Sequence, residues 1–154
     1  MLIVFDLDFT LWDAGGTWCD HLSPPFVRRN GDVVDRQGSC VQLYPDVRSI
    51  LQWCRDHGVS TAIASRTGEP SWARELLDLF EIRNHFDYEQ IYPGSKQYHF
   101  NALRRESGHP YERMIFFDDE YRNIEDVQAL GVHAVHVPNG LTRTLFEKIE
   151  KGIR

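Results

Sequence analysis

The sequence has 154 residues, a formal net charge of −6 at pH 7 and 42% hydrophobic residues. A chain of this length can bury a sizeable core and leaves no room for a second domain of ordinary size. Its net negative charge argues against a general nucleic-acid surface and against binding to anionic membranes. We therefore expect one domain over residues 1–154 that binds neither nucleic acid nor a membrane.

The start of the chain indicates where the protein works. A predicted strand begins at Leu2, so the first residues do not follow the pattern of a signal peptide. No apolar stretch approaches the length of a membrane span. We therefore expect a cytoplasmic protein.

The first predicted strand is the short apolar run Leu2–Phe5, which suits a strand covered on both faces. Asp6, Asp8 and Thr10 follow it directly. Because a charge cannot sit inside such a strand, Asp6 should mark its carboxyl end, the edge where open α/β sheets bind ligands. Two neighbouring carboxylates stay ionised together only when a cation shares them, and Mg²⁺ suits hard oxygen ligands that also receive a phosphate.

Residues 13–44 come next and are irregular and rich in Gly, Pro and Asp. Within them, Pro25–Arg36 is typical of a β-hairpin, because Asn30-Gly31 supplies the positive φ angles of a tight turn. We therefore expect residues 13–44 to form a flap inserted into the domain, with this hairpin as the candidate cover over the site.

The rest of the chain alternates predicted helices and strands. The expected strands cover residues 59–64, 89–92, 114–117 and 132–137. The expected helices begin at Pro45 and Pro70, cover 98–107, include 124–130 and end the chain at 142–151. Such alternation predicts an α/β fold with a parallel sheet and right-handed crossovers.

Further polar residues stand after the later apolar runs or before a predicted helix: Ser65 and Arg66, Lys96, and Asp118 with Asp119. Lys96 is distinctive because the only other lysines are Lys148 and Lys151. A compact ammonium can contact a nucleophile and a phosphoryl oxygen together, which a planar guanidinium does less well.

In this order the motifs resemble the haloacid dehalogenase superfamily, whose signature Asp-x-Asp-x-Thr matches Asp6–Thr10. Ser65, Lys96 and the pair Asp118 and Asp119 match the three later motifs, so the resemblance covers nearly the whole chain. The fuller strings around them are similar to the magnesium-dependent phosphatase-1 branch. The resemblance implies a doubly wound, Rossmann-like parallel sheet with strand order 3-2-1-4-5 and a minimal cap.

The resemblance also implies a Mg²⁺-dependent phosphomonoesterase that acts through an aspartyl-phosphate intermediate. Asp6 would be the nucleophile. Asp8 would protonate the leaving oxygen and later accept a proton from water, while its backbone carbonyl binds the metal. The partner would be a phosphorylated small molecule or a phosphotyrosine-bearing peptide, that is, an aryl, phosphotyrosine or sugar phosphate. The pattern specifies no oligomeric state.

The remaining roles follow from the same resemblance. The phosphoryl group would be bound by Thr10, Ser65, Arg66 and Lys96. The metal would be held by Asp6, Asp8, Asp118 and Asp119. Neighbouring residues on a strand point to opposite faces, so we expect only one of the last pair to reach the metal directly and favour Asp118. Asp119 would then act through water, orient another ligand or cap the next helix.

Several side chains keep more than one interpretation. Arg66 would grip an anionic group of the substrate or pair with Asp119 or Asp8, and Asn123 would brace the loop after the acidic pair. The aromatic residues expected at the entrance are Trp12, Trp18, His21 and Phe26, although Trp12 suits the core equally well.

Three residues lie where some relatives carry a zinc loop: Cys19, His21 and Cys40. A closed zinc site needs four ligands, and the sequence shows no fourth. Small buried or half-buried thiols are the alternative, and no disulfide framework is expected from an odd number of cysteines.

Two other functions stay open. A receiver-like signalling module uses acids, a hydroxyl, a lysine and Mg²⁺ on a similar sheet, but its acidic pair follows the first strand, whereas here the pair follows the fourth. A relative that binds phosphorylated groups without hydrolysing them is the second alternative. Against it stands the presence of all four motifs.

Overall fold

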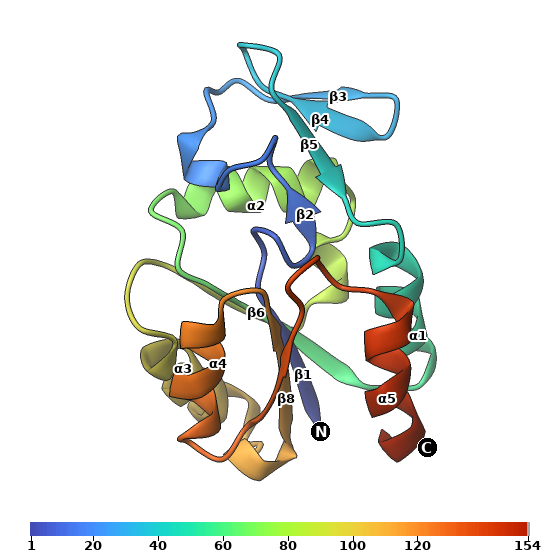
Figure 1. Cartoon of the computed structure of the whole chain (residues 1–154), viewed down its shortest axis with the longest axis vertical. Helices are drawn as coiled ribbons and strands as arrows, with labels where there is room; N and C mark the ends of the chain where they lie inside the picture. The colour runs from blue at the N-terminus through green and yellow to red at the C-terminus, as the bar shows by residue number, and fades with distance from the viewer. Residues whose placement is uncertain (154) are drawn as a thin grey trace.

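A computed structural model describes residues 1–153, so Arg154, the last residue of the predicted domain, lies outside the described residues. A five-stranded parallel sheet forms the centre of the protein, in the order β7-β6-β1-β8-β9 (Figure 1). Counted along the chain within this sheet alone, the order is 3-2-1-4-5. The strands are β1 (Leu2–Phe5), β6 (Ser60–Ser65), β7 (Tyr88–Ile91), β8 (Met114–Asp118) and β9 (His133–His136).

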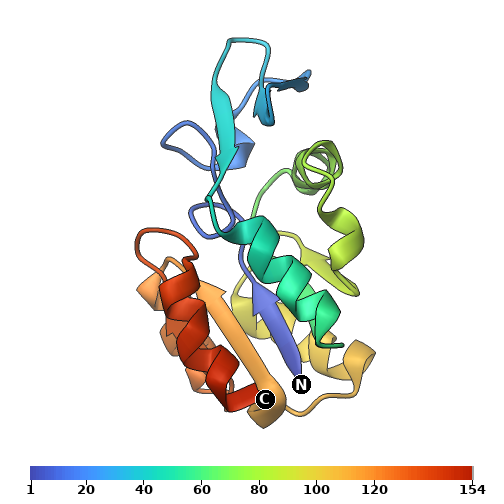
Figure 2. The same cartoon turned by 90° about the vertical axis from the view of Figure 1, so that its right-hand side faces the viewer.

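Helices cover both faces of this sheet. They are α1 (Val47–Asp56), α2 (Pro70–Leu79), α3 (Lys96–Ser107), α4 (Tyr121–Gln128) and α5 (Arg143–Ile153), with short 3-10 helices η1 (Cys19–His21), η2 (Arg83–His85) and η3 (Tyr111–Arg113). Figure 2 shows α1 and α5 together on one face of the sheet. Within residues 1–153, no helix has both the length and the apolar character that a bilayer span requires.

β1 lies in the middle of the sheet and is buried on both sides. Ile3 and Phe5 pack into the core under α1, α2 and α5, while Leu2 and Val4 pack under α3 and α4. Successive side chains of a strand point to opposite faces, and all of these are 0% exposed. The uninterrupted apolar run is therefore what the doubly wound arrangement requires.

A second, antiparallel sheet of four strands has the order β2-β5-β4-β3. Its strands are β2 (Trp12–Asp13), β3 (Val27–Arg29), β4 (Asp32–Val34) and β5 (Cys40–Leu43). β3 and β4 form the predicted hairpin, with Asn30 (φ 55°) and Gly31 (φ 87°) at its turn. The sequence did not indicate that β5 joins the hairpin to β2, since this pairing depends on residues far apart in the chain. We call residues 12–43 the flap.

The hairpin packs against α2. Arg28 Nε donates a hydrogen bond to the carbonyl oxygen of Leu79 at 2.8 Å. Phe26 is 7% exposed, and its ring meets that of Trp72 edge to face at 6.3 Å. Phe26, predicted at the entrance of the site, therefore belongs to the packing between the hairpin and α2.

The start of α3 differs from the prediction. The sequence placed Lys96 in a loop and the helix start at Tyr98, whereas the helix begins at Lys96. The side chain of Ser95 caps it by accepting a hydrogen bond from the backbone amide of Gln97. The cap places Lys96 on the first helical turn, where the residue is buried.

Candidate active site

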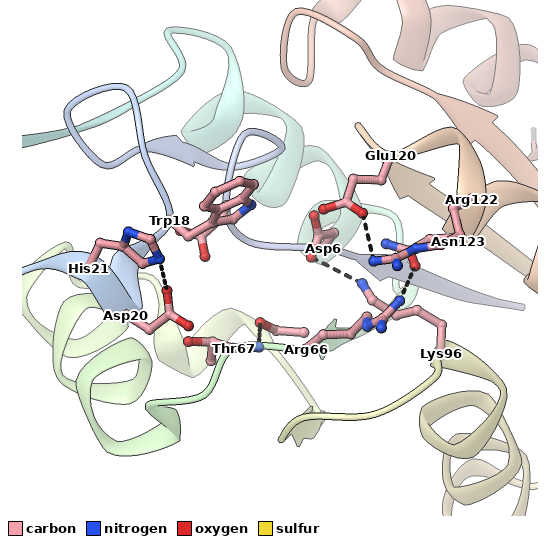
Figure 3. A pocket seen from close by; sticks show the side chains of 12 residues that line it. Asp6, Trp18, Asp20, His21, Arg66, Thr67, Lys96, Glu120, Arg122 and Asn123 are labelled. Carbon is pink, nitrogen blue, oxygen red and sulfur yellow. Dashed lines mark hydrogen bonds and ion pairs between the residues drawn. The ribbon is translucent and has the colours of Figure 1, made fainter.

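The carboxyl ends of β1, β6 and β8 meet at a cavity of about 290 Å³ (Figure 3). β1 lies between β6 and β8 in the sheet, so side chains that follow these strands become neighbours. The cavity is lined by Asp6, Asp8, Trp18, Asp20, His21, Ser65, Arg66, Thr67, Lys96, Glu120, Arg122 and Asn123. The cavity therefore lies at the edge of the sheet where the sequence predicted the site.

Lys96 forms the centre of the charged network. Its Nζ donates to Asp6 Oδ1 at 3.0 Å, to Asp118 Oδ2 at 3.0 Å and to the carbonyl oxygen of Ala64 at 2.6 Å. An ammonium has three protons, so this set uses all of them. Burial lowers the pKa of Lys96, but Asp118 and Asp6 outweigh it and hold that pKa above its ordinary value. Lys96 is therefore a buried, charged group.

The carboxylates around Lys96 carry more negative charge than one ammonium balances. Asp6, Asp118 and Asp119 each place an oxygen within 4.8 Å of the others. Burial and the charge of Asp118 raise the pKa of Asp6 well above its ordinary value, even though Lys96 opposes this. Burial also raises the pKa of Asp119, to about 6. Hard oxygen ligands with excess negative charge fit a divalent cation such as Mg²⁺.

The two acids after β8 differ in how many donors they already have. Asp118 Oδ1 accepts from the backbone amide of Glu120 at 2.8 Å, and its Oδ2 accepts from Lys96 Nζ and Asn123 Nδ2, each at 3.0 Å. Asp119 Oδ1 accepts a long hydrogen bond from Thr10 at 3.4 Å. A carboxylate whose oxygens already have donors is a poorer metal ligand. The geometry therefore favours Asp119 over Asp118, the opposite of the preference drawn from the sequence.

Thr10 supports the nucleophile candidate. Its hydroxyl lies 3.2 Å from Asp6 Oδ2 and 3.4 Å from Asp119 Oδ1, and the residue is 0% exposed. With Lys96 on Asp6 Oδ1, both oxygens of Asp6 have a donor. The Thr10 hydroxyl thus contacts these two carboxylates, and Thr10 is not among the residues that line the cavity, where the sequence predicted it to contact phosphate.

Asp8 lies in the cavity wall but outside the group formed by the other three acids. Its Oδ1 accepts from Trp12 Nε1 at 2.8 Å and from the backbone amide of Cys19 at 2.9 Å. Burial raises the pKa of Asp8, and these hydrogen bonds only partly oppose it. Trp12 is 0% exposed, so its predicted place at the entrance is wrong and the core alternative is correct.

Arg66 and Asn123 form a relay to Asp118. Arg66 Nη1 donates to Asn123 Oδ1 at 3.0 Å, and Asn123 Nδ2 donates to Asp118 Oδ2 at 3.0 Å. The predicted bracing of this loop by Asn123 is confirmed by these contacts. Among the hydrogen bonds of residues 1–153, Arg66 has this amide partner and is not paired with Asp119 or Asp8.

His99 is a buried residue beside the site that the sequence did not reveal. Its Nε2 lies 2.8 Å from the carbonyl oxygens of both Ser65 and Tyr92, and its Nδ1 lies 3.1 Å from that of Ser95. The ring is 0% exposed and stacks on Tyr92 with centroids 4.3 Å apart. It joins the ends of β6 and β7 to the helix that carries Lys96. The signal in the sequence that could have indicated His99 is its position one helical turn after Lys96.

The flap forms one wall of the cavity. Figure 3 shows Trp18, Asp20 and His21 on the opposite side of the cavity from Arg122 and Glu120. Trp18 is 47% exposed, and its ring lies 5.6 Å from that of His21. The sequence predicted both residues at the entrance of the site. In the structure Trp18 directly precedes η1, His21 ends it, and both line the cavity.

The cysteines lie apart from one another. Cys19 Sγ lies 3.5 Å from Thr67 Oγ1, and Cys40 Sγ lies 3.8 Å from Asp32 Oδ2. Within the described part of the chain, the group with metal-ligand spacing is the one formed by the carboxylates beside Lys96. Cys19 is buried and Cys40 half-buried, as the alternative to a zinc loop predicted.

The sequence matches the acid phosphatase family over residues 1–153. It is 47% identical over 152 residues to magnesium-dependent phosphatase 1 of Homo sapiens, covering 97% of this chain and 85% of the relative. It is 38% identical over 162 residues to a HAD-like hydrolase superfamily protein of Schizosaccharomyces pombe, covering 97% of this chain and 86% of the relative. The fold is similar to that of a haloacid dehalogenase-like hydrolase from Streptococcus pneumoniae, with a TM-score of 0.69 at 13% identity over 98% of this chain and 97% of the other.

Proposed function

The chain belongs to the acid phosphatase family within the haloacid dehalogenase superfamily, and on that premise we propose that it hydrolyses phosphate monoesters through a phosphorylated Asp6. Family membership and relatives named magnesium-dependent phosphatases make it a phosphatase that uses Mg²⁺. The observation that carries the finer proposal is the Asp6 carboxylate, which lines the cavity with Lys96 Nζ 3.0 Å from its Oδ1.

Asp6 is the nucleophile in this proposal. Lys96 and Thr10 each hold one of its oxygens, which fixes the carboxylate at the cavity. Attack on phosphorus forms the aspartyl phosphate and breaks the ester bond, and attack by water then releases inorganic phosphate and restores the carboxylate. Fixing the attacking group in this way removes much of the entropic cost of the first displacement.

Mg²⁺ would be held by Asp119, by the backbone carbonyl of Asp8 and by Asp6 Oδ2, whose hydrogen bond from Thr10 is longer, at 3.2 Å, than any that Asp118 accepts. Bound there, the ion would neutralise charge on the phosphoryl oxygens and orient the phosphate. Asp118 instead positions Lys96 and Asn123, as its hydrogen bonds indicate.

Asp8 serves as general acid and then as general base. Because burial raises its pKa, the carboxyl retains a proton for the leaving oxygen more readily than an exposed aspartate does. A receiver-like module or a non-hydrolytic binding protein has no need of such a group. Asp8 is therefore the feature that supports turnover over these two alternatives.

The substrate is an aryl phosphate, a sugar phosphate or phosphotyrosine, the last either free or within a peptide. Ser65 and Arg66 line the cavity and would bind the phosphoryl group, while Lys96, whose three protons are already donated, would attract it through its positive charge. Trp18 and His21 line the flap wall, where an aromatic or sugar ring of the leaving group would pack.

The test is Asp6→Asn, which keeps the shape of the side chain and removes its nucleophilicity. The variant should lose Mg²⁺-dependent hydrolysis of 4-nitrophenyl phosphate while it stays folded, because Asp118 still balances the charge of Lys96. Acid quench of the wild type during turnover of a ³²P-labelled ester should trap a phosphoprotein that Asp6→Asn does not form. Appreciable turnover by Asp6→Asn would remove Asp6 from the covalent role. A wild type that binds phosphate esters without turnover would favour the non-hydrolytic alternative.

A further inference from the structure

We infer that Trp12 is a positioning residue for the acid/base Asp8, an inference that rests on the proposed function. The indole Nε1 of Trp12 donates to Asp8 Oδ1 at 2.8 Å, and the backbone amide of Cys19 donates to the same oxygen at 2.9 Å. An oxygen that accepts two N–H groups has no room for a proton of its own. The proton that Asp8 donates to the leaving oxygen is therefore carried by Oδ2.

Both donors belong to the flap and are themselves held in place. Trp12 is the first residue of β2, pairs with Leu43 of β5 and stacks on Phe80 with ring centroids 6.1 Å apart. Cys19 is the first residue of η1. Trp12 and Cys19 are 0% exposed, so water does not compete for these hydrogen bonds. The segment inserted after Asp8 thus orients the acid as well as covering the cavity.

Two donors are needed because a carboxyl group turns easily about its last side-chain torsion, which is broad and two-fold. With Trp12 and Cys19 both donating to Oδ1, the plane of the Asp8 carboxyl is fixed. Without the indole N–H, Cys19 alone holds the carboxyl group, its plane turns more easily, and Oδ2 is less often aimed at the leaving oxygen. Loss of the indole N–H should therefore slow hydrolysis most for esters whose leaving oxygen needs a proton.

The first experiment is Trp12→Phe, which keeps an aromatic ring against Phe80 and removes the indole N–H. The value of kcat/KM reports the first phosphoryl transfer, in which Asp8 acts as the acid. For an alkyl phosphate, kcat/KM should fall about tenfold more than for 2,4-dinitrophenyl phosphate, whose leaving group needs little protonation. The control is Trp53→Phe, because Trp53 is 7% exposed and its Nε1 has no hydrogen-bond partner among residues 1–153. It should leave the ratio between the two esters unchanged.

A double-mutant cycle with Asp8→Asn shows whether Trp12 acts through Asp8. Asp8→Asn should itself slow the alkyl ester selectively, and adding Trp12→Phe should then cause no further selective loss. If Asp8→Asn slows both esters equally, the acid/base role of Asp8 fails. If Asp8→Asn is selective but Trp12→Phe is not, the positioning inference is overturned while the proposed function stands. The positioning inference is also overturned if adding Trp12→Phe to Asp8→Asn still slows the alkyl ester more than the dinitrophenyl ester.

A second pair of variants decides the question if Trp12→Phe does not fold. Cys19→Pro removes the other donor, and Cys19→Ala removes the same thiol while keeping the amide. Proline suits the first position of a helical turn, and Trp18 before it is already extended, with φ −80° and ψ 151°. Relative to Cys19→Ala, Cys19→Pro should lose about tenfold more kcat/KM on the alkyl ester than on the dinitrophenyl ester. Equal losses on the two esters would overturn the inference.

Discussion

The ammonium of Lys96 lies 3.0 Å from Asp118 Oδ2, in a pair whose side chains are 1% and 0% exposed. The same ammonium lies 3.0 Å from Asp6 Oδ1. A buried pair of this kind depends on both partners, because removing one leaves the other charge without compensation. Lys96 therefore holds together Asp6, the proposed nucleophile, and Asp118 at the end of β8.

Replacing Lys96 with an apolar residue of similar length should expose this dependence. Lys96→Met should lower the free energy of unfolding by about 3 kcal/mol, as the loss of one partner of a buried ion pair does. Urea unfolding in the presence of a chelator measures the change, and saturating Mg²⁺ should restore part of it by supplying positive charge. The control is Lys148→Met, on an exposed residue of α5, which should change stability by less than about 0.5 kcal/mol. A similarly small effect of Lys96→Met would mean that the acids around it are not charged together.

The acids after β8 should respond differently to substitution. Asp119→Asn should raise the Mg²⁺ concentration for half-maximal activity by more than about tenfold, because Asp119 has oxygens left for a metal. Asp118→Asn should mainly lower stability and kcat, because it weakens the contacts with Lys96 and Asn123. Mg²⁺ titrations of activity, with unfolding measured in parallel, separate the two effects. The reverse order would restore Asp118 as the direct ligand.

The sequence predicted those site residues that directly follow an apolar run. Asp6 and the pair Asp118 and Asp119 end buried strands, so the rule that ligands bind at the carboxyl edge of a parallel sheet was enough to bring them together. It could not predict which oxygen of Asp118 each donor occupies. That depends on Lys96 and Asn123, whose positions come from the packing of α3 and α4 against the sheet.

The parts that sequence analysis missed are contacts made by ordinary core residues. The sequence around Trp12 suits a core residue, and Trp12 is buried, yet the one polar atom of its side chain donates a hydrogen bond to Asp8. His99 falls on the inner face of α3, and its partners are backbone carbonyls that leave no trace in side-chain patterns. β5 is short and pairs with strands on either side of it, a register set only when the flap has folded.

Stability should also depend on pH through Glu89 at the edge strand β7. Its carboxylate accepts from Arg83 Nε at 2.7 Å and from Arg74 Nε at 3.2 Å. Burial alone would raise the pKa of Glu89, but these partners outweigh it and hold that pKa below its ordinary value. A depressed folded-state pKa stabilises the protein above the unfolded-state value of about 4.3, and that stability is lost as pH falls through the folded-state value.

Glu89→Gln should therefore destabilise the protein by about 1 kcal/mol at pH 7, and the difference from wild type should shrink as the pH falls below about 4. Glu75→Gln, on an exposed residue of α2, is the matched control and should show no such trend. Urea unfolding at a series of pH values gives both curves. A difference that stays constant down to pH 3 would mean that the contribution of Glu89 does not come from its charge.

The last prediction concerns which part of the flap selects the substrate. The sequence placed Trp18, His21 and Phe26 at the entrance; of these, Trp18 and His21 line the cavity, whereas Phe26 and the hairpin pack on α2. Trp18 is 47% exposed and lies edge to face against Phe9, at 6.0 Å between ring centroids, so much of its surface is free for a leaving group. An aromatic leaving group packed there would bury apolar area worth about 1–2 kcal/mol, which corresponds to about a tenfold change in KM.

Trp18→Ala should thus raise KM for aryl phosphates about tenfold and leave kcat for a small activated ester nearly unchanged. Val27→Ala is the control, because Val27 is a 58% exposed apolar residue of the same flap that does not line the cavity. Replacing Pro25–Arg36 by a tight turn should change KM less than Trp18→Ala does, since that segment contributes no residue to the cavity lining. If the shortened protein folds and loses activity towards every ester, the hairpin holds η1, and with it Asp8, in place. In that case the flap acts as one unit and Trp18 is not its separable specificity element.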